Sequence, residues 1–268
     1  MDSTSPIYAL ILGIIQGLTE FLPVSSSGHL VVVSWFMNGK SLPLSLNIVL
    51  HIGTLSAVLL YFWKSWLGLG LGIKNRILKG TKSFESEVLL PSLILGSVPA
   101  GVVGLLWKDS IQSLFHNPLS VAVPLVIVGI LLWQVDIRAR LVKRLDDLTV
   151  RDGLLIGVAQ AFSLIPGVSR SGITTMAGRQ LGFDREAAAR FSFLLGTPAM
   201  GGAAVLYGKE LLAHATDPVF LIGAVVSCLV GCIAIKFFLS FIKRFGFGVF
   251  AIYRCVLAAV ILYLLYQA

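Results

Sequence analysis

Apolar residues run along most of the 268-residue chain in long blocks rather than alternating with polar ones. A helix needs roughly 20 residues, within a range of about 17 to 25, to cross a lipid bilayer. Six blocks fall within that range. They predict membrane-spanning helices over residues 45–63, 88–107, 119–135, 187–208, 218–240 and 247–266.

Two further apolar regions, 6–37 and 153–181, are interrupted at their centres by polar and helix-breaking residues. The first interruption reads PVSSSGH at 23–29, and the second reads PGVSRSG at 166–172. Each half is too short to span a bilayer, so each region predicts a re-entrant helical hairpin. Non-helical backbone at membrane depth is tolerated only inside protein or beside a water-filled cavity. The two turns therefore predict a cavity.

The distribution of Lys and Arg predicts the orientation, because these residues are retained on the cytoplasmic side. Segments 64–87 and 136–152 each hold five Lys or Arg residues, whereas 108–118 and 208–217 each hold one. With six spans, both termini are then expected on the extracytoplasmic side. The first hairpin enters from that outer face, and the second enters from the cytoplasmic face.

The two halves of the chain also match each other in sequence. A shift of 144 places Gly13, Gln16, Val24, Ser25, Ser27 and Gly28 on Gly157, Gln160, Val168, Ser169, Ser171 and Gly172. Each copy contains one hairpin and three spans, so the second copy must be inverted, as in folds whose broken helices meet near the midplane. We predict an all-α integral membrane protein with six transmembrane helices and two re-entrant hairpins. It forms one membrane domain, 1–268, with repeats at 6–107 plus 119–135 and at 153–266.

Composition excludes a water-soluble fold. Hydrophobic residues make up 56% and charged residues 13%, whereas soluble domains carry about 25% charged residues. The net charge of +8 is attributed to a lipid surface and to orientation signals rather than to nucleic acid, which is not expected as a partner. The three cysteines lie in apolar runs and predict neither disulfides nor a metal site.

The two hairpins differ in their reactive groups. The first carries Glu20, Ser26 and His29, where the second carries Leu164, Arg170 and Ile173. This difference predicts catalysis on the first repeat and anion capture on the second. Turn hydroxyls and the N–H groups of helix N-termini bind phosphate, and Arg170 can hold two phosphate oxygens. The residues expected to contact such a substrate are Ser25, Ser27, Gly28, Ser169, Ser171, Gly172 and Thr174.

Gln16 and Glu20 are four residues apart and share one helix face. Together with phosphate oxygens they could supply part of the oxygen shell of Mg²⁺ or Ca²⁺. The alternative for Gln16 is a hydrogen bond that only supports the turn.

The segments QGLTEFLPVSSSGH at 16–29 and PGVSRSGIT at 166–174 resemble the two signature motifs of the bacterial undecaprenyl-diphosphate phosphatases, the membrane family linked to bacitracin resistance. The resemblance implies hydrolysis of undecaprenyl diphosphate to undecaprenyl phosphate in the bacterial inner membrane, which recycles the lipid carrier of cell-wall synthesis. It also implies a divalent metal and an active site open to the extracytoplasmic face. By motif position, Glu20, Ser26, His29 and Arg170 match the residues attributed to catalysis. The family motif often has an acid where this chain has Gln16, which leaves Glu20 as the only carboxylate near the metal.

The expected mechanism is phosphoryl transfer. Arg170, the N–H groups of the second turn and the metal hold the diphosphate, while His29 acts as general base on Ser26 or on a water molecule. Ser26 is then either a covalent nucleophile, or a helix cap or hydrogen-bond donor to the phosphate while a water molecule attacks. Solvated or packing roles are expected for His51, His116 and His214. Arg254 is expected either to bind lipid phosphate or to have a structural role, in an ion pair or in bonds to freed backbone carbonyls.

The sequence also bears on two other functions. Inverted repeats with broken helices are also typical of transporters, so a transporter or flippase of polyprenyl phosphate lipids is the alternative. The acid-phosphatase type of lipid phosphatase shares only the Ser-Gly-His at 27–29 and is excluded because its other motif elements are missing. Small residues at 201–204 are compatible with a homodimer.

Overall fold

The computed structural model describes residues 5–38, 42–107, 110, 119–139, 143–213 and 216–267. Over these residues the chain forms helices and turns, with one isolated β-bridge between Lys143 and Phe183 and no strand. The predicted all-α class is confirmed. The α-helices are α1 (Pro6–Thr19), α2 (Ser26–Asn38), α3 (Leu44–Tyr61), α4 (Trp63–Lys79), α5 (Leu90–Leu106), α7 (Leu119–Arg138), α8 (Val150–Ala161), α9 (Arg170–Gln180), α10 (Arg185–Leu206), α11 (Gly208–Ala213), α12 (Pro218–Arg244) and α13 (Gly248–Gln267).

Five helical segments are long and apolar enough to cross a membrane. They are Leu44–Tyr61, Glu85–Leu106, Leu119–Arg138, Pro218–Arg244 and Gly248–Gln267. Each coincides with a predicted span, with ends that differ by a few residues. The chain is therefore an all-α, multi-pass membrane protein.

The sixth predicted span, 187–208, corresponds to α10, which is not among these five segments. Its first turns carry Arg185, Glu186 and Arg190, which lower its apolar character. Residues 191–196 are all buried, and α10 packs against α9, α3 and α5. The middle of this helix is therefore enclosed by other helices, whereas Val205 and Leu206 near its end are exposed.

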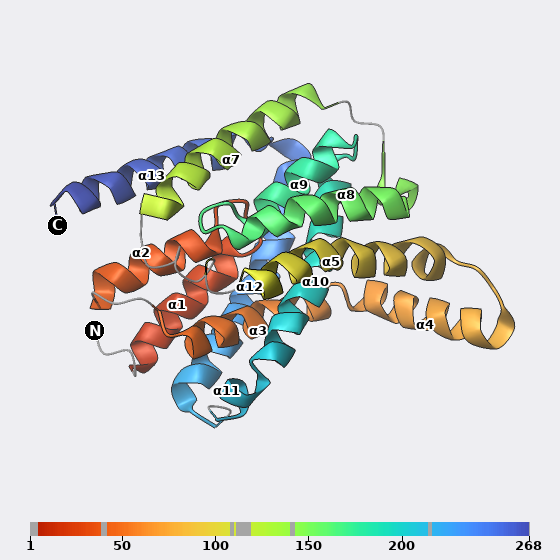
Figure 1. Cartoon of the computed structure of the whole chain (residues 1–268), viewed down its shortest axis with the longest axis horizontal. Coiled ribbons are helices and arrows are strands. Elements are labelled where there is room, and N and C mark those ends of the chain that lie inside the picture. The colour runs from red at the N-terminus through yellow and green to blue at the C-terminus, as the bar shows by residue number, and fades with distance from the viewer. Residues whose placement is uncertain are drawn as a thin grey trace.

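Both predicted interruptions are breaks between two helices. Residues 20–25 separate α1 from α2, and a short 3₁₀ turn (Phe162–Leu164) followed by residues 165–169 separates α8 from α9. Figure 1 shows the two turns side by side near the middle of the molecule, and Ser171 Oγ at the start of α9 donates a hydrogen bond to the Leu22 carbonyl of the first turn at 3.1 Å. The two hairpins thus meet at their turns.

Each hairpin packs its first helix on a long helix from the other half of the chain, through glycines that allow a close approach. A Cβ at Gly17 of α1 would lie 2.7 Å from Cβ of Val230 on α12. A Cβ at Gly157 of α8 would overlap the backbone of Gly96 on α5. Larger residues at either position would push the helices apart and displace the turns that they carry.

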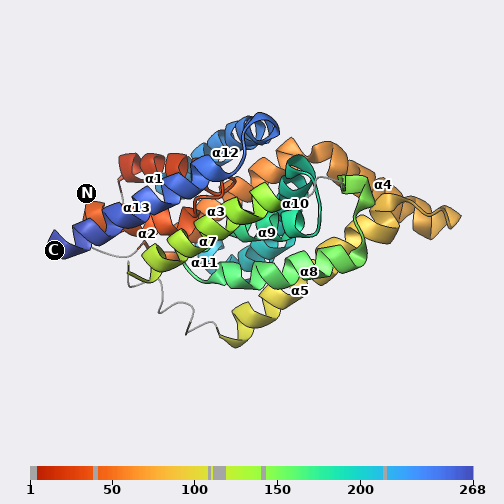
Figure 2. The same ribbon diagram turned by 90° about the horizontal axis from the view of Figure 1, so that it is seen from above.

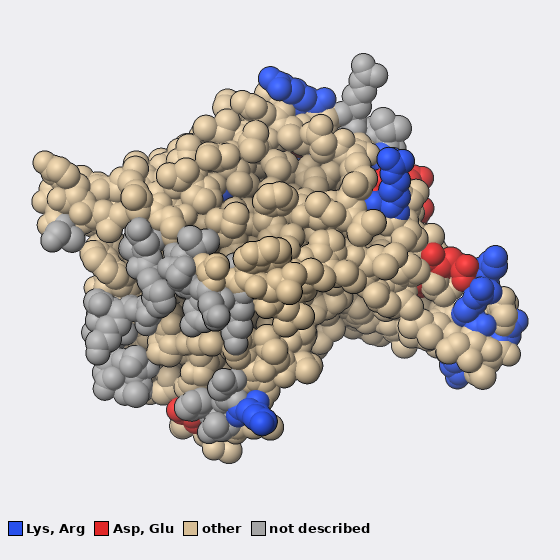
Figure 3. Space-filling model, viewed as in Figure 1, with Lys and Arg blue, Asp and Glu red and all other residues tan. Residues whose placement is uncertain are grey.

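The basic segment 64–87, which connects two predicted spans, is mostly helical. It contains α4 and the start of a π-helical turn, Glu85–Leu89, which leads into α5. Figures 1 and 2 both show α4 projecting from the helix bundle. In Figure 3, charged side chains gather at the edges of the visible face, including the edge formed by α4, and most of the face between them is uncharged.

Candidate active site

The two turns share an unusual backbone conformation. Ser25 has φ of 72° and Ser169 has φ of 73°, and they are the two non-glycine residues with positive φ in the described chain. Such a conformation is uncommon for a residue with a side chain. In each turn the serine Oγ accepts a hydrogen bond at 3.2 Å from the backbone N–H three residues later, that of Gly28 or Gly172. Both serines therefore cap the helix that follows.

Arg254 of α13 holds both turns in place. Its side chain is fully buried, and its guanidinium donates to the carbonyl of Pro23 at 3.0 Å and to the carbonyl of Gly167 at 2.8 Å. Further bonds reach the carbonyls of Val168, Pro124 and Leu125. Of the two roles left open for Arg254, the structure shows the binding of freed backbone carbonyls.

Glu20 lies at the centre of a cluster that joins the two hairpins. Its side chain is 5% exposed. Ser26 Oγ donates to Glu20 Oε2 at 2.5 Å, and Arg170 Nη2 donates to Glu20 Oε1 at 3.0 Å. Gln16 Nε2 also donates to Glu20 Oε2, at 3.1 Å. The structure thus brings together Gln16, Glu20, Ser26 and Arg170, although Arg170 is 150 residues from Glu20 in the sequence.

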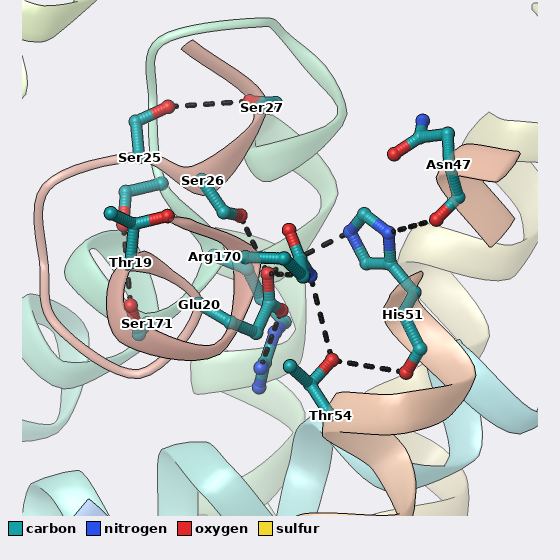
Figure 4. A network of polar contacts seen from close by, with 12 residues as sticks. Thr19, Glu20, Ser25, Ser26, Ser27, Asn47, His51, Thr54, Arg170 and Ser171 are labelled. Atoms are coloured by element: carbon teal, nitrogen blue, oxygen red, sulfur yellow. Dashed lines mark hydrogen bonds and ion pairs between the residues drawn. The ribbon is translucent and has the colours of Figure 1, made fainter. Parts of the chain in front are cut away.

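Helix α3 forms the opposite side of this cluster, as Figure 4 shows. Thr54 Oγ1 lies 3.4 Å from Gln16 Nε2. His51 Nε2 lies 3.7 Å from Glu20 Oε2, and its Nδ1 is 2.8 Å from the Asn47 carbonyl. The expected solvated or packing role of His51 is corrected, since its imidazole faces the buried carboxylate. His116 and His214 lie outside the described residues.

His29 lies apart from the Glu20 carboxylate. Its Nδ1 is 2.7 Å from the Ser25 carbonyl, and its Nε2 is 2.7 Å from the Tyr253 hydroxyl. The two rings stack with centroids 5.6 Å apart. With Nδ1 donating to the carbonyl, Nε2 accepts from Tyr253 when the imidazole is neutral. In this arrangement both ring nitrogens are engaged, and His29 fixes the Ser25 turn.

Several residues predicted to bind substrate have partners within the protein. Ser27 Oγ lies 3.2 Å from Ser25 Oγ, and Ser171 Oγ lies 3.3 Å from Ser169 Oγ. The buried Thr174 hydroxyl donates to the Arg170 carbonyl at 2.7 Å. The side chains of Ser26 and Ser27 are half-buried. These two hydroxyls at the start of α2 are therefore more accessible than the buried Ser25.

Two buried atoms of the cluster have no hydrogen-bond partner: Gln16 Oε1 and Arg170 Nε. The amide oxygen is a suitable ligand for a hard cation, and the guanidinium N–H can donate to an anion. The described residues contain no group of three or more His, Cys, Asp and Glu side chains that could hold a metal. Protein groups alone therefore do not complete a metal site here. The residues fit a divalent ion only if a bound anion supplies further oxygens.

The fold and these contacts define a multi-pass, all-α membrane protein in which two helix–turn–helix segments join a carboxylate, a hydroxyl and a guanidinium. The family model described as bacitracin resistance protein BacA matches residues 9–260. The chain belongs to this family.

Curated relatives match over almost their full length. A protein of Thermodesulfovibrio yellowstonii is 43% identical, with 96% of each chain covered. A protein of Pelotomaculum thermopropionicum is 42% identical over 95% of each chain. A protein of Moorella thermoacetica is 41% identical over 94% of this chain and 95% of the relative. All three are named undecaprenyl-diphosphatase.

Proposed function

We propose that this protein hydrolyses undecaprenyl diphosphate to undecaprenyl phosphate and inorganic phosphate at the Glu20 cluster. The observation that carries the proposal is the bridge from Ser26 through Glu20 to Arg170, which combines a hydroxyl, a carboxylate and a guanidinium between two helix N-termini. Relatives of nearly equal length and about 40% identity bear the name of this activity. As an enzyme of this kind it would return the lipid carrier to cell-wall synthesis.

The proposed site lies between two inverted repeats. Support comes from the matched turns, in which Ser25 and Ser169 adopt nearly the same φ, and from the matched glycine contacts of α1 and α8. In this arrangement α10 is the sixth span, the hairpins are re-entrant, and both termini lie on the extracytoplasmic side of the bacterial inner membrane. The active site opens to that side. A homodimer through 201–204 is also proposed, since a Cβ at Gly201 or Gly202 would meet no atom of the described residues within 4 Å outside its own stretch of helix.

Arg170 and the N-termini of α2 and α9 bind the diphosphate in this proposal. The Arg170 guanidinium would turn part of its hydrogen bonding from Glu20 and the Ser192 carbonyl to the phosphate oxygens. Positive charge and N–H groups fixed in a buried site stabilise the charge that develops during transfer. A divalent ion, Mg²⁺ or Ca²⁺, would be held by Gln16 and Glu20 together with phosphate oxygens, and it would supply neutralisation of phosphate charge.

Ser26 is the proposed nucleophile. Its oxygen would form a bond to the terminal phosphorus while the bond from phosphorus to the bridging oxygen breaks, which releases undecaprenyl phosphate. The Ser26 proton would pass to Glu20, which already accepts its hydrogen bond. Water would then hydrolyse the phosphoserine and release inorganic phosphate. The role of His29 as a base stays a prediction, because it requires His29 Nε2 to exchange its bond with Tyr253 for one near Ser26.

Trapping of the intermediate distinguishes Ser26 from a water nucleophile. Acid quenching during turnover of substrate labelled on the terminal phosphate should leave label on Ser26, located by mass spectrometry. Ser26→Ala should lose about 10³-fold in rate or more, whereas Ser27→Ala, the matched change at the next half-buried serine, should lose much less. A fully active Ser26→Ala enzyme would end the covalent version and leave the attack to water.

Purified protein in detergent should release inorganic phosphate from undecaprenyl diphosphate. A chelator should stop the release, and added Mg²⁺ or Ca²⁺ should restore it. Release that continues in the chelator would remove the metal from the proposal while leaving hydrolysis intact. A folded wild-type protein that releases no phosphate under any metal condition would contradict the hydrolase and favour transport of the lipid.

A further inference from the structure

Helix α4 leaves one of its faces uncovered by the rest of the protein. Trp63, Leu67, Leu71 and Leu78 are spaced as neighbours along one side of a helix. They are 56%, 53%, 49% and 68% exposed. We call these four residues the α4 apolar stripe. An exposed apolar stripe of this kind is unfavourable in water and indicates a contact with something else.

The opposite side of α4 is already occupied. A Cβ at Gly72 would lie 2.8 Å from Ser83 Oγ and 3.2 Å from Glu85 Cβ. Arg76 Nε forms an ion pair with Glu87 Oε1 at 3.0 Å. The segment that leads into α5 therefore covers this side, and it orients the apolar stripe outward.

The position of α4 relative to the bilayer follows from the helices at its two ends. The apolar segment Leu44–Tyr61 ends two residues before α4, and only the buried Phe62 separates them. The next apolar segment begins at Glu85. Both ends of the α4 region are thus attached to segments long enough to span the membrane, so α4 begins at the edge of the bilayer.

The basic residues of the α4 region indicate which kind of surface the apolar stripe contacts. Lys64, Lys74, Lys79 and Lys82 are all exposed, and residues 63–84 contain no Asp or Glu. Lys74 lies on the side of the stripe itself, three residues after Leu71 and four before Leu78. A long lysine side chain at such a position can extend along the apolar surface to the headgroups. Lys64 Nζ lies 5.7 Å from the centre of the Trp63 ring, so a cation stands directly beside the stripe. An amphipathic helix with an aromatic and aliphatic face flanked by lysines lies in the interface of membranes that contain anionic lipids.

We propose that α4 lies in the membrane interface with its apolar stripe among the acyl chains and its lysines on the headgroups of anionic phospholipids. The partner is the bilayer leaflet on the basic side of the protein. This proposal does not depend on the hydrolase activity.

Quenching of tryptophan fluorescence by brominated lipid tests the contact. The full chain is reconstituted in phosphatidylcholine vesicles that contain equal mole fractions of either brominated phosphatidylglycerol or brominated phosphatidylcholine. The signal of Trp63 is isolated by comparison with Trp63→Phe, because the chain contains five tryptophans. Brominated phosphatidylglycerol should quench Trp63 more strongly than brominated phosphatidylcholine, and high salt should reduce the difference.

The variant Lys64→Gln/Lys74→Gln/Lys79→Gln should lose the stronger quenching of Trp63 by brominated phosphatidylglycerol. The affinity of the α4 region for the anionic lipid should fall by about fivefold for each lysine neutralised. A charge-matched control, Lys236→Gln/Lys243→Gln/Arg244→Gln on α12, should keep it. Equal quenching of Trp63 by both lipids, or an unchanged preference in the α4 variant, would overturn the anionic-lipid assignment. Trp63 that neither lipid quenches would overturn the interfacial location and place α4 in water or against another protein.

Discussion

Arg170→Gln should lower kcat/KM for undecaprenyl diphosphate by about 10³-fold while the protein stays folded. The change removes the guanidinium that lies 3.0 Å from Glu20 and has an unpartnered N–H in the buried site. Loss of one fixed donor at developing charge typically costs 10²- to 10³-fold, and loss of an arginine in phosphoryl transfer 10³- to 10⁵-fold. Phosphate release by purified protein measures the effect.

Two further variants test whether the loss of activity is specific to the Arg170 guanidinium. Arg170→Lys keeps the charge but loses the planar fork, so it should fall between Arg170→Gln and wild type. Arg151→Gln makes the same chemical change at an exposed arginine of α8 and should retain wild-type activity. An active Arg170→Gln enzyme would show that the phosphates bind elsewhere.

Arg254→Met should destabilise the protein by about 3 kcal/mol or more, because it removes five hydrogen bonds to buried carbonyls. A buried polar group left without its partner costs about 1 to 3 kcal/mol, although part of that cost is relieved by relaxation. For a chain of this size the change corresponds to a fall of about 10 °C in Tm. Thermal unfolding in detergent, followed by fluorescence or by size-exclusion chromatography, measures it.

Arg244→Met at the exposed end of α12 is the matched control and should leave Tm within about 2 °C of the wild type. Activity provides a second measure, since loosened turns at Pro23 and Gly167 should also reduce turnover. A wild-type Tm for Arg254→Met would mean that the turns do not depend on this side chain.

Local chemistry explains why the turns could be predicted. Pro23 and Pro166 interrupt apolar sequence, and the serines and glycines after them favour a capped helix start. The shift of 144 that aligns the two turns is also visible in the sequence. The structure gives the aligned residues Ser25 and Ser169 nearly the same φ. The breaks and the capped helix starts depend only on neighbours within a few residues.

The partners across the bundle could not be predicted in the same way. The sequence predicts a solvated or packing role for His51, yet its Nε2 lies 3.7 Å from Glu20 Oε2. One signal was available: Gly53-Thr54 matches Gly196-Thr197 at a shift of 143, and His51 precedes Thr54 by three residues. Which helix face turns toward Glu20 depends on how α3 packs on α1 and α12, and a single sequence does not contain that information.

The sequence does not predict helix α4, for a different reason. Its four basic residues and three glycines do not favour a helix, since glycine weakens an isolated helix. The apolar residues at 63, 67, 71 and 78 have helical spacing, but their stripe is short and is diluted by the glycines. Contacts with the segment that leads into α5 stabilise the helix. Tertiary packing here outweighs intrinsic propensity.

A double-mutant cycle on phosphate release, with Glu20→Gln, Arg170→Gln and the combined variant, tests most directly whether residues of the two hairpins form one phosphate site. The two side chains form an ion pair, so we expect strong coupling between the two substitutions. The combined variant should lose far less activity than the product of the two single losses. Losses that multiply would show that Glu20 and Arg170 act independently, and they would contradict a shared site.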